Sequence, residues 1–407
     1  MPRITAENIV LISKKNVSIK NIPLLLQVTW STGFNLVSRI LPSYFATVAS
    51  ATQIGSIYSI YAGAKFLAIP CGWLSDKIGK VKTLFLVFFV LPVLTISFVI
   101  SKSVFFFTLM FFLIGLLGNF YYSSINAIIT IFFNHKKTEY LFKLESMYQL
   151  GMVLGPIIGG FLTLRYGIEK AFYTWAGLSI LGLIFSAFLF KKELPETKRF
   201  EKPSLKQLFS QLGEKKFDFI IFLIVGSFLT GLFESMTTLS IPLYATKIGF
   251  DISKVGLIVG IGSLLSIFGL LFLGKKLEEL DKTYSLLLTT FLIGISTLFI
   301  VFVHSLAGIV LLLGVFTIGR AGGLNITRSF LSENLGENIR ATAMSINDTS
   351  QYIARFIGPP FAGILIDKIN INASFISIPI IAILGILLLV VYKKCNYKKS
   401  EFDKFEI

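Results

Sequence analysis

The sequence has 407 residues, of which 54% are hydrophobic and 15% are charged, and its formal net charge is +16. Soluble domains carry roughly a quarter charged residues, and disordered chains combine low hydrophobicity with high charge, so both classes are excluded. The basic residues lie between long apolar runs, which indicates contact with lipid headgroups rather than with nucleic acid. We therefore expect a polytopic membrane protein without a nucleic-acid partner.

Twelve apolar stretches are long enough to cross a bilayer, because a helix needs about 20 residues to span about 30 Å of hydrocarbon. Runs such as 83–101 are apolar on every side, which argues against the alternating strands of a membrane barrel. We predict an all-α integral membrane protein with two pseudo-symmetric six-helix bundles at 1–190 and 217–407, joined by a cytoplasmic linker at 191–216. The predicted spans are 22–45, 52–75, 81–101, 103–132, 139–165, 169–190, 217–245, 252–274, 283–304, 306–333, 340–367 and 371–392.

The Lys and Arg residues are distributed unevenly between the loops. Of the 38, 27 lie at the termini and in the even-numbered loops, and six lie in the odd-numbered loops. Since positively charged loops stay on the cytoplasmic side, we expect cytoplasmic termini in a multi-pass protein of the plasma membrane. Cys71 falls inside a predicted span and Cys395 in the C-terminal tail, so we expect no disulfide framework. The two His residues stand far apart and no Cys/His cluster has metal-ligand spacing, so we expect no metal site. No cofactor is expected.

The two halves of the sequence repeat one another. The offset between matching residues grows slowly from 200 to 203, as expected after a duplication with small insertions. The matches are Pro42 and Tyr44 with Pro242 and Tyr244, Gly55 with Gly256, Gly72 and Asp76 with Gly274 and Glu278, and Gly155-Pro156 with Gly358-Pro359. Parallel repeats of this kind are typical of secondary transporters whose substrate site lies between the halves near the membrane midplane.

Two motifs stand out against this background. Residues 72–80, between the second and third spans, read GWLSDKIGK and contain Gly72, Asp76, Lys77, Gly79 and Lys80. A carboxylate at the end of a span can face the positive N-terminus of a neighbouring helix. The lysines act either as partners of that carboxylate or only as anchors at the cytoplasmic surface.

The second motif, GMVLGPIIGG, occupies residues 151–160 in the fifth span. Its glycines recur every four residues and form one smooth helix face, which permits close approach of another helix, and its proline bends the helix. The motif residues are Gly151, Gly155, Pro156, Gly159 and Gly160, with Gly358 and Pro359 at the matching place in the eleventh span. These faces either form a seam along which the two halves could rock or only pack neighbouring helices together.

With twelve spans and a six-plus-six repeat, the two motifs resemble those of the major facilitator superfamily, and the second resembles the motif of its drug/proton antiporter branch. The resemblance implies that Asp76 contacts the eleventh span and holds the cytoplasmic side closed in the outward-facing state. It also implies that spans one, four, seven and ten line the substrate cavity. The candidate cavity residues are then Asn35, Arg39, Tyr122, Asn126, Glu234, Arg320 and Asn325.

Ionisable groups at membrane depth are costly and mark functional positions. The predicted ones are Arg39, Lys65, Glu234, Arg320, Arg328 and Arg355. Glu234 and Arg320 both fall near the middle of their spans and are expected to pair. The pair is either a structural tie within the second half or the exchange point between proton and substrate, with Glu234 as the proton-coupling residue. Arg328 lies near enough to the cytoplasmic end to serve as an anchor.

We conclude that the sequence encodes a secondary transporter rather than an enzyme. The first hypothesis is proton-coupled efflux of drugs or metabolites by alternating access, in a monomer whose partners are the lipid bilayer, a small-molecule substrate and protons. The alternative is an organic-anion or sugar-type carrier that works by symport or exchange, and it draws on the excess of buried cations over buried acids.

Overall fold

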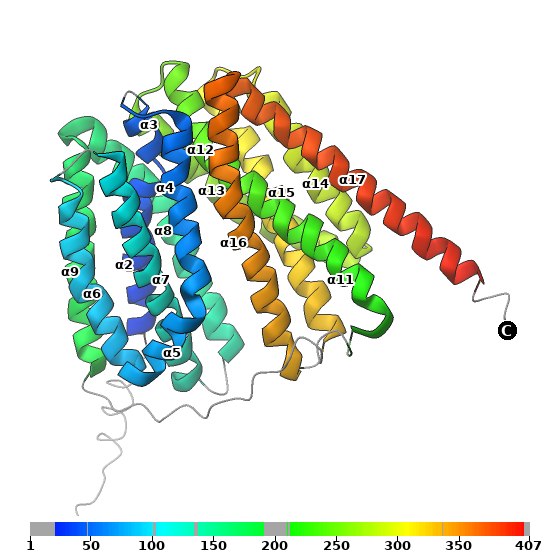
Figure 1. Cartoon of the computed structure of the whole chain (residues 1–407), viewed down its shortest axis with the longest axis horizontal. Helices are drawn as coiled ribbons and strands as arrows, with labels where there is room; N and C mark the ends of the chain where they lie inside the picture. Colours follow the sequence, from blue (N-terminus) through cyan, green and yellow to red (C-terminus); the bar gives the residue numbers. More distant parts are fainter. Residues whose placement is uncertain are drawn as a thin grey trace, which may run out of the picture. The chain divides into compact units, whose positions relative to one another are not determined.

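The computed structural model describes residues 21–46, 48–100, 103–133, 137–190, 210, 212–335 and 337–402. Most of the predicted linker at 191–216 lies outside these residues. Each of the twelve predicted spans coincides with one helix or with two or three consecutive helical segments (Figure 1). In the described part of the chain, ten helical segments are long and apolar enough to cross a membrane. The other two spans are the 17-residue helix α2 and the more polar helix α16.

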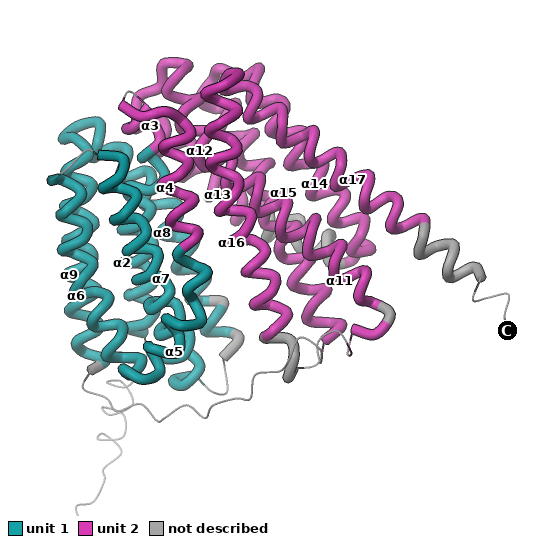
Figure 2. Tube along the Cα trace, in the orientation of Figure 1, with its two compact units in different colours: residues 1–41, 64–198 teal, residues 42–63, 199–407 magenta. Residues whose placement is uncertain are grey.

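The described chain forms two compact units (Figure 2). Unit 1 comprises residues up to Leu41 together with Ala64–Lys198. It contains α2 (Ile22–Ser38), the 3-10 turn Lys65–Leu67, α5 (Ala68–Ile78), α6 (Lys80–Ser97), α7 (Val104–Phe132), α8 (Lys137–Tyr166) and α9 (Ile168–Phe190). Its core includes a stack of Phe98 on Phe172, with ring centroids 4.9 Å apart. Gly33 leaves room on α2 for the indole of Trp175.

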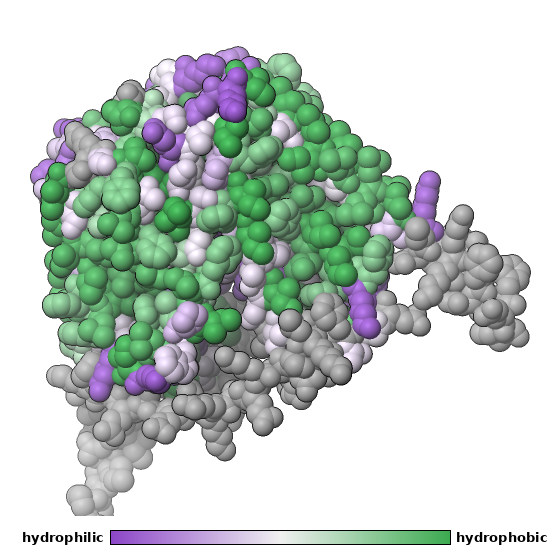
Figure 3. Space-filling view, viewed as in Figure 1, coloured by the Kyte–Doolittle hydropathy of each residue, from purple (hydrophilic) through white to green (hydrophobic). Residues whose placement is uncertain are grey.

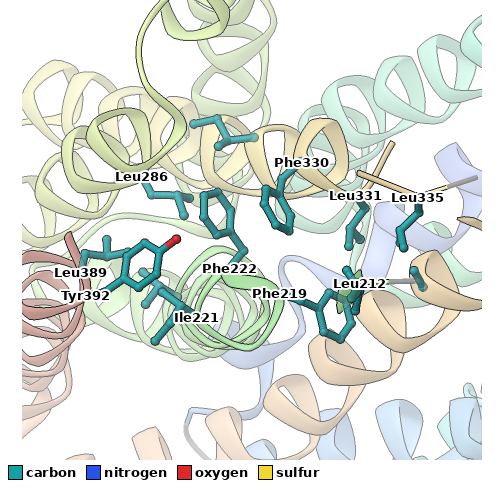
Figure 4. Packing of buried hydrophobic residues seen from close by; sticks show 13 residues of the cluster. Leu212, Phe219, Ile221, Phe222, Leu286, Phe330, Leu331, Leu335, Leu389 and Tyr392 are labelled. Carbon is teal, nitrogen blue, oxygen red and sulfur yellow. The ribbon is translucent and has the colours of Figure 1, made fainter. Parts of the chain in front are cut away.

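Unit 2 comprises Pro42–Gly63 and the residues from Arg199 onward. It contains α3 (Leu41–Phe45, from its second residue), α4 (Ala51–Ala64, up to Gly63), α11 (Lys216–Phe222), the π-helix η4 (Leu223–Leu229), α12 (Thr230–Lys247), α13 (Ile252–Glu279), α14 (Lys282–Ile300), α15 (Leu306–Asn334), α16 (Glu337–Lys368) and α17 (Ile371–Phe402). Leucine, isoleucine and aromatic side chains fill the core between its helices (Figure 4). At its centre the rings of Phe222 and Phe330 stack with centroids 4.4 Å apart.

The same pairs of spans pack together in both units, which supports the internal repeat. In unit 1, α2 packs on α8, α6 on α9 and on α7, and α5 on α7. In unit 2, the matching helices do the same, since α12 packs on α16, α14 on α17 and on α15, and α13 on α15. The division at residues 191–216 stays a prediction, because the contacts group residues 42–63 with the second half of the chain.

The surface of each unit suits a lipid environment. On the face seen in Figure 3, apolar residues cover the helices, and hydrophilic residues gather near their ends. Large apolar side chains of α6, α9 and α17, such as Phe89, Phe188 and Leu384, are more than half exposed. Water would make such exposure unfavourable, whereas hydrocarbon solvates it.

Two predicted spans are interrupted, and both interruptions carry polar residues. The second span has a 3-10 turn at Lys65–Leu67 between α4 and α5, and the seventh contains the π-helix Leu223–Leu229. The first span also differs from the prediction, because α2 ends at Ser38 and Arg39 lies in the turn before α3. Hydropathy alone did not indicate these interruptions, since the flanking residues remain apolar.

Candidate functional site

Glu234 of α12 lies between two arginines in unit 2. Its Oε1 is 3.3 Å from Nη1 of Arg320 on α15, and its Oε2 accepts a hydrogen bond of 2.8 Å from Nη2 of Arg355 on α16. The Glu234 and Arg320 side chains are only 14% and 13% exposed. Leaving either charge unpaired there would be costly, so the ion pairs tie α12 to both neighbouring helices. The predicted pairing of Glu234 with Arg320 is confirmed, and Arg355 is an additional partner.

We call Glu234, Arg320 and Arg355 the Glu234 triad. It combines two positive charges with one negative charge, so it is an electropositive group at membrane depth. Gln351, one turn before Arg355 on α16, accepts a 3.4 Å hydrogen bond from Nη2 of Arg355. The triad can therefore respond chemically in two ways: a proton can neutralise the carboxylate, or an anion can compete with the carboxylate for a guanidinium.

The backbone around Glu234 is adapted to bring three helices together. The π-helix Leu223–Leu229 precedes it, and the hydroxyl of Thr230 donates to the carbonyl of Val225, five residues earlier. Such wide turns are frequently found at functional sites. Gly231 then lets α12 approach α16 closely, because a Cβ at this position would lie 3.3 Å from the Cα of Gln351. This approach places Glu234 within reach of Arg355.

The predicted cavity residues fall into both units. Asn35 and Arg39 meet in unit 1, where Nε of Arg39 donates to Oδ1 of Asn35 at 3.3 Å. Asn35 is buried, and its Nδ2 donates to the carbonyl of Ser31 at 2.8 Å. Asn126 on α7 and Asn325 on α15 have exposed side chains. Their assignment to a cavity stays a prediction.

Lys65 forms a second polar group in unit 1. It is 8% exposed and lies in the 3-10 turn between α4 and α5. Its Nζ is 5.3 Å from the ring centroid of Tyr122 and lies against α7 where Gly118 has no side chain, since a Cβ there would be 2.6 Å from Nζ. Trp30 stacks on Tyr121 beside this group, with centroids 4.5 Å apart.

The sequence indicated Lys65 only as a cation at membrane depth and did not indicate Trp30. The signal in the sequence is a lysine in the second predicted span, Lys65, together with two consecutive tyrosines in the fourth, Tyr121 and Tyr122. A cation over an aromatic face is stabilised by the ring quadrupole. The partner of a membrane-embedded lysine is thus expected among the aromatic residues of neighbouring spans.

The loop motif at 72–80 forms a tight connection between α5 and α6. Gly79 has φ of +98° and ψ of 134°, a backbone conformation that side-chain-bearing residues avoid. Asp76 is 60% exposed and pairs with Lys80 at 2.6 Å, and Nζ of Lys80 also donates to Ser123 of α7 at 3.0 Å. Lys77 lies over the ring of Trp73, 3.6 Å from its centroid. Lys80 is thus a packing partner within unit 1, beyond a simple surface anchor, and the gating role of Asp76 stays a prediction.

The glycine face of α8 packs against α2 within unit 1. A Cβ on Gly151 would lie 2.5 Å from that of Ser31, one on Gly155 would lie 2.6 Å from that of Asn35, and one on Gly159 would overlap the carbonyl of Leu36. On α16 of unit 2, Gly358 similarly packs against α12. Of the two alternatives, the contacts support helix packing, because these glycines pack two helices of the same unit, and rocking along the faces stays a prediction.

Arg328, expected to be an anchor, makes an ion pair with Asp348. Its Nη2 is 3.7 Å from Oδ1 of Asp348, and both side chains are about half exposed. Glu145 of α8, which the offset of 203 residues matches to Asp348, is exposed and accepts a hydrogen bond from Gln149 at 2.9 Å. Exposed pairs of this kind contribute little to stability.

Comparison with known families identifies the fold. The model of the Major Facilitator Superfamily matches residues 24–359 and 223–406, which together run from α2 to the end of α17 and beyond. The chain belongs to the major facilitator superfamily. It is a multi-pass plasma-membrane transporter of small molecules and not an enzyme.

Several superfamily members resemble this chain over most of their length. It is 26% identical to an uncharacterized MFS-type transporter, MJ1560, of Methanocaldococcus jannaschii, covering 86% of this chain and 92% of that one. It is 25% identical to the multidrug resistance protein MdtG of Klebsiella pneumoniae, covering 82% and 85%. It is 23% identical to the quinolone resistance protein NorA of Staphylococcus aureus, covering 91% and 95%.

Solved structures share the fold of this superfamily member at low sequence identity. A bacterial homologue of the human lysosomal transporter Spinster, in an inward-facing and unoccupied conformation, matches with a TM-score of 0.69 at 13% identity, covering 93% of this chain and 95% of that one. The nucleoside transporter NupG matches with a TM-score of 0.71 at 14% identity, covering 92% and 98%. These likenesses concern the fold alone.

Proposed function

We propose that this transporter exports small amphipathic compounds in exchange for protons by alternating access, with Glu234 as the coupling carboxylate. The observation that carries the proposal is the Glu234 triad, in which one buried carboxylate holds two guanidinium groups from different helices. The relatives named for multidrug and quinolone resistance support efflux as the direction of transport.

Protonation of Glu234 would change the contacts of three helices at once. The ionised carboxylate attracts Arg320 on α15 and Arg355 on α16. A proton removes its negative charge, and both guanidiniums then lose the attraction of this carboxylate. Because charged groups at membrane depth are costly, the loss of this attraction favours a shift of both guanidiniums toward other acceptors or toward water. A single protonation is thereby linked to a rearrangement of α12, α15 and α16.

The test is the Glu234→Gln variant, which keeps the size of the side chain but cannot be ionised. In proteoliposomes we expect transport driven by an imposed pH gradient to fall to background, while exchange of substrate for substrate continues. The matched control is Glu333→Gln, since Glu333 pairs with Lys282 at an exposed end of α15. An undiminished response of the Glu234→Gln protein to the pH gradient would exclude Glu234 as the coupling residue and leave the triad as a structural tie.

The excess positive charge of the triad favours a second candidate, a carrier of organic anions by symport or exchange. A panel of compounds separates the two candidates, because specific binding raises the melting temperature of the purified protein. Stabilisation by lipophilic cations supports the efflux proposal. Stabilisation by dicarboxylates or sugar phosphates, lost on replacing Arg355 by Gln, supports the anion carrier.

A further inference from the structure

The start of α4 is capped by a carboxylate from another helix, that of Asp367 near the C-terminus of α16. The backbone N–H of Ala51 donates to its Oδ1 at 2.9 Å, and that of Thr52 donates to its Oδ2 at 2.8 Å. The third N–H of the helix, from Gln53, donates to the hydroxyl of Ser50 at 3.2 Å. The donors that a helix start leaves unpaired are thus shared between a local cap and a distant one.

Below this cap, α4 lies against α16 along a series of close contacts about one helical turn apart. Gly363 faces the backbone of Ala51 and Thr52, where a Cβ would come within 2.6 Å. Further along, Gly55 faces the carbonyl of Pro359, and the hydroxyl of Ser59 donates to the carbonyl of Phe356. All these residues belong to unit 2, and Figure 2 shows α4 beside α16.

This attachment involves a span that belongs to both units. Residues up to Gly63 of α4 group with unit 2, whereas the chain from Ala64 through α5 groups with unit 1. Asp367 is the last residue of the predicted eleventh span and Asp76 directly follows the second, so the two carboxylates lie beside an odd-numbered and an even-numbered loop, respectively. Because successive spans cross in alternate directions, these loops lie on opposite sides of the membrane.

We propose that Asp367 is a latch that holds the start of the second span on the eleventh, and that the latch opens during each transport cycle. It is the counterpart of the predicted Asp76 contact at the opposite membrane surface. In the present structure the Asp367 latch is formed, whereas the Asp76 carboxylate is 60% exposed and paired with Lys80. The proposal rests on transport by alternating access, which is part of the proposed function.

The chemistry of the latch makes it reversible. Asp367 is exposed to solvent, and a carboxylate at an exposed helix N-terminus contributes only about 0.3–1 kcal/mol, corresponding to about a twofold to fivefold change in an equilibrium. A contact of this strength biases two conformations without locking one of them. Asp367→Asn retains an acceptor oxygen but removes the charge, so it should shift the equilibrium toward the released state by up to about fivefold.

The latch is tested in the full-length protein by distances between α4 and α16. Spin labels are placed on cysteines at Ile60 and Ile364, whose side chains are exposed, with Cys71 and Cys395 replaced by serine. In proteoliposomes without substrate or pH gradient, Asp367→Asn should increase the population at longer distance, and Asp367→Glu should stay near the parent protein. The matched control is Asp251→Asn, because Asp251 caps its own helix α13 through the N–H of Lys254.

Superimposable distance distributions for Asp367→Asn and Asp251→Asn would overturn the latch. If Asp367→Asn does not fold, the labelled protein with Asp367 intact is measured at low and high salt, since salt screens an exposed charge at a helix end. A distribution that does not shift toward longer distance at high salt is then the contradicting result. All of these distance measurements are made without a proton gradient. Their outcome therefore does not depend on whether Glu234 couples protons to transport.

Discussion

Gly155 offers a direct test of how α2 and α8 pack. A Cβ at this position would lie 2.6 Å from Cβ of Asn35 and 2.8 Å from its carbonyl carbon. Carbon atoms in van der Waals contact are about 3.5–4.0 Å apart. Since one of the two atoms belongs to the backbone, no change of rotamer removes the overlap. In Gly155→Ala, α2 and α8 must therefore move apart.

The cost can be isolated with a control glycine in the same unit. Gly177 of α9 is exposed, and a Cβ there would meet no atom within 4 Å. Alanine is more favourable than glycine inside a helix by about 0.5–1 kcal/mol, and both variants gain this amount. Their difference in stability is therefore the packing term alone, about 1–3 kcal/mol for an overpacked interior.

Thermal unfolding of the purified proteins in one detergent measures this difference. We expect Gly177→Ala to melt at or above the temperature of the parent protein, and Gly155→Ala to melt below Gly177→Ala. Displacement of Asn35 should also weaken its 3.3 Å hydrogen bond with Nε of Arg39. Equal melting temperatures of the two alanine variants would refute the close packing of α8 on α2.

Two further predictions separate backbone strain from side-chain displacement. Gly79→Ala should melt at a lower temperature than Gly177→Ala, because the φ of +98° at Gly79 costs a residue with a side chain about 1–3 kcal/mol. A Cβ at Gly79 would meet nothing within 4 Å, so no clash contributes. Equal melting temperatures would mean that the turn does not need this conformation. Gly118→Ala should displace the ammonium group of Lys65 and so lower the melting temperature of the parent protein, but not that of a Lys65→Met protein. An equal loss in both backgrounds would contradict the contact between Gly118 and Lys65.

The architecture could be predicted from the sequence because its cause is local. An apolar run of about 20 residues must be helical in hydrocarbon, where each backbone group needs an internal partner. The cost of a buried charge likewise indicated that Glu234 and Arg320 would pair. These inferences require only composition and approximate depth, both of which hydropathy provides.

The third member of the triad was harder to predict. Arg355 was indicated only as a cation at membrane depth, and its contact with Glu234 joins residues 121 positions apart. Whether it faces α12 depends on the rotation of α16, which is fixed by close contacts such as that of Gly231 with Gln351. Hydropathy does not indicate which neighbouring helix each face of α16 meets, because that depends on the packing of the whole unit.

The repeat shows which constraint is shared by the two units. Applying the offsets found in the sequence, Ser31 and Gly151 of unit 1 correspond to Gly231 and Ala354 of unit 2. Each pair is in contact, since a Cβ on Gly151 would meet that of Ser31, and a Cβ on Gly231 would lie 3.3 Å from that of Ala354. The glycine is on the fifth span in one unit and on the seventh span in the other.

The shared feature is therefore the small combined size of two facing side chains rather than a glycine at a fixed place. Close approach of two helices is possible when either residue lacks a Cβ, provided that the other is small. This accounts for alanine at position 354 of α16, where α8 has Gly151, because the facing residue on α12 is Gly231. At position 358, α16 retains the glycine that matches Gly155, and the facing residue there is the larger Ser235.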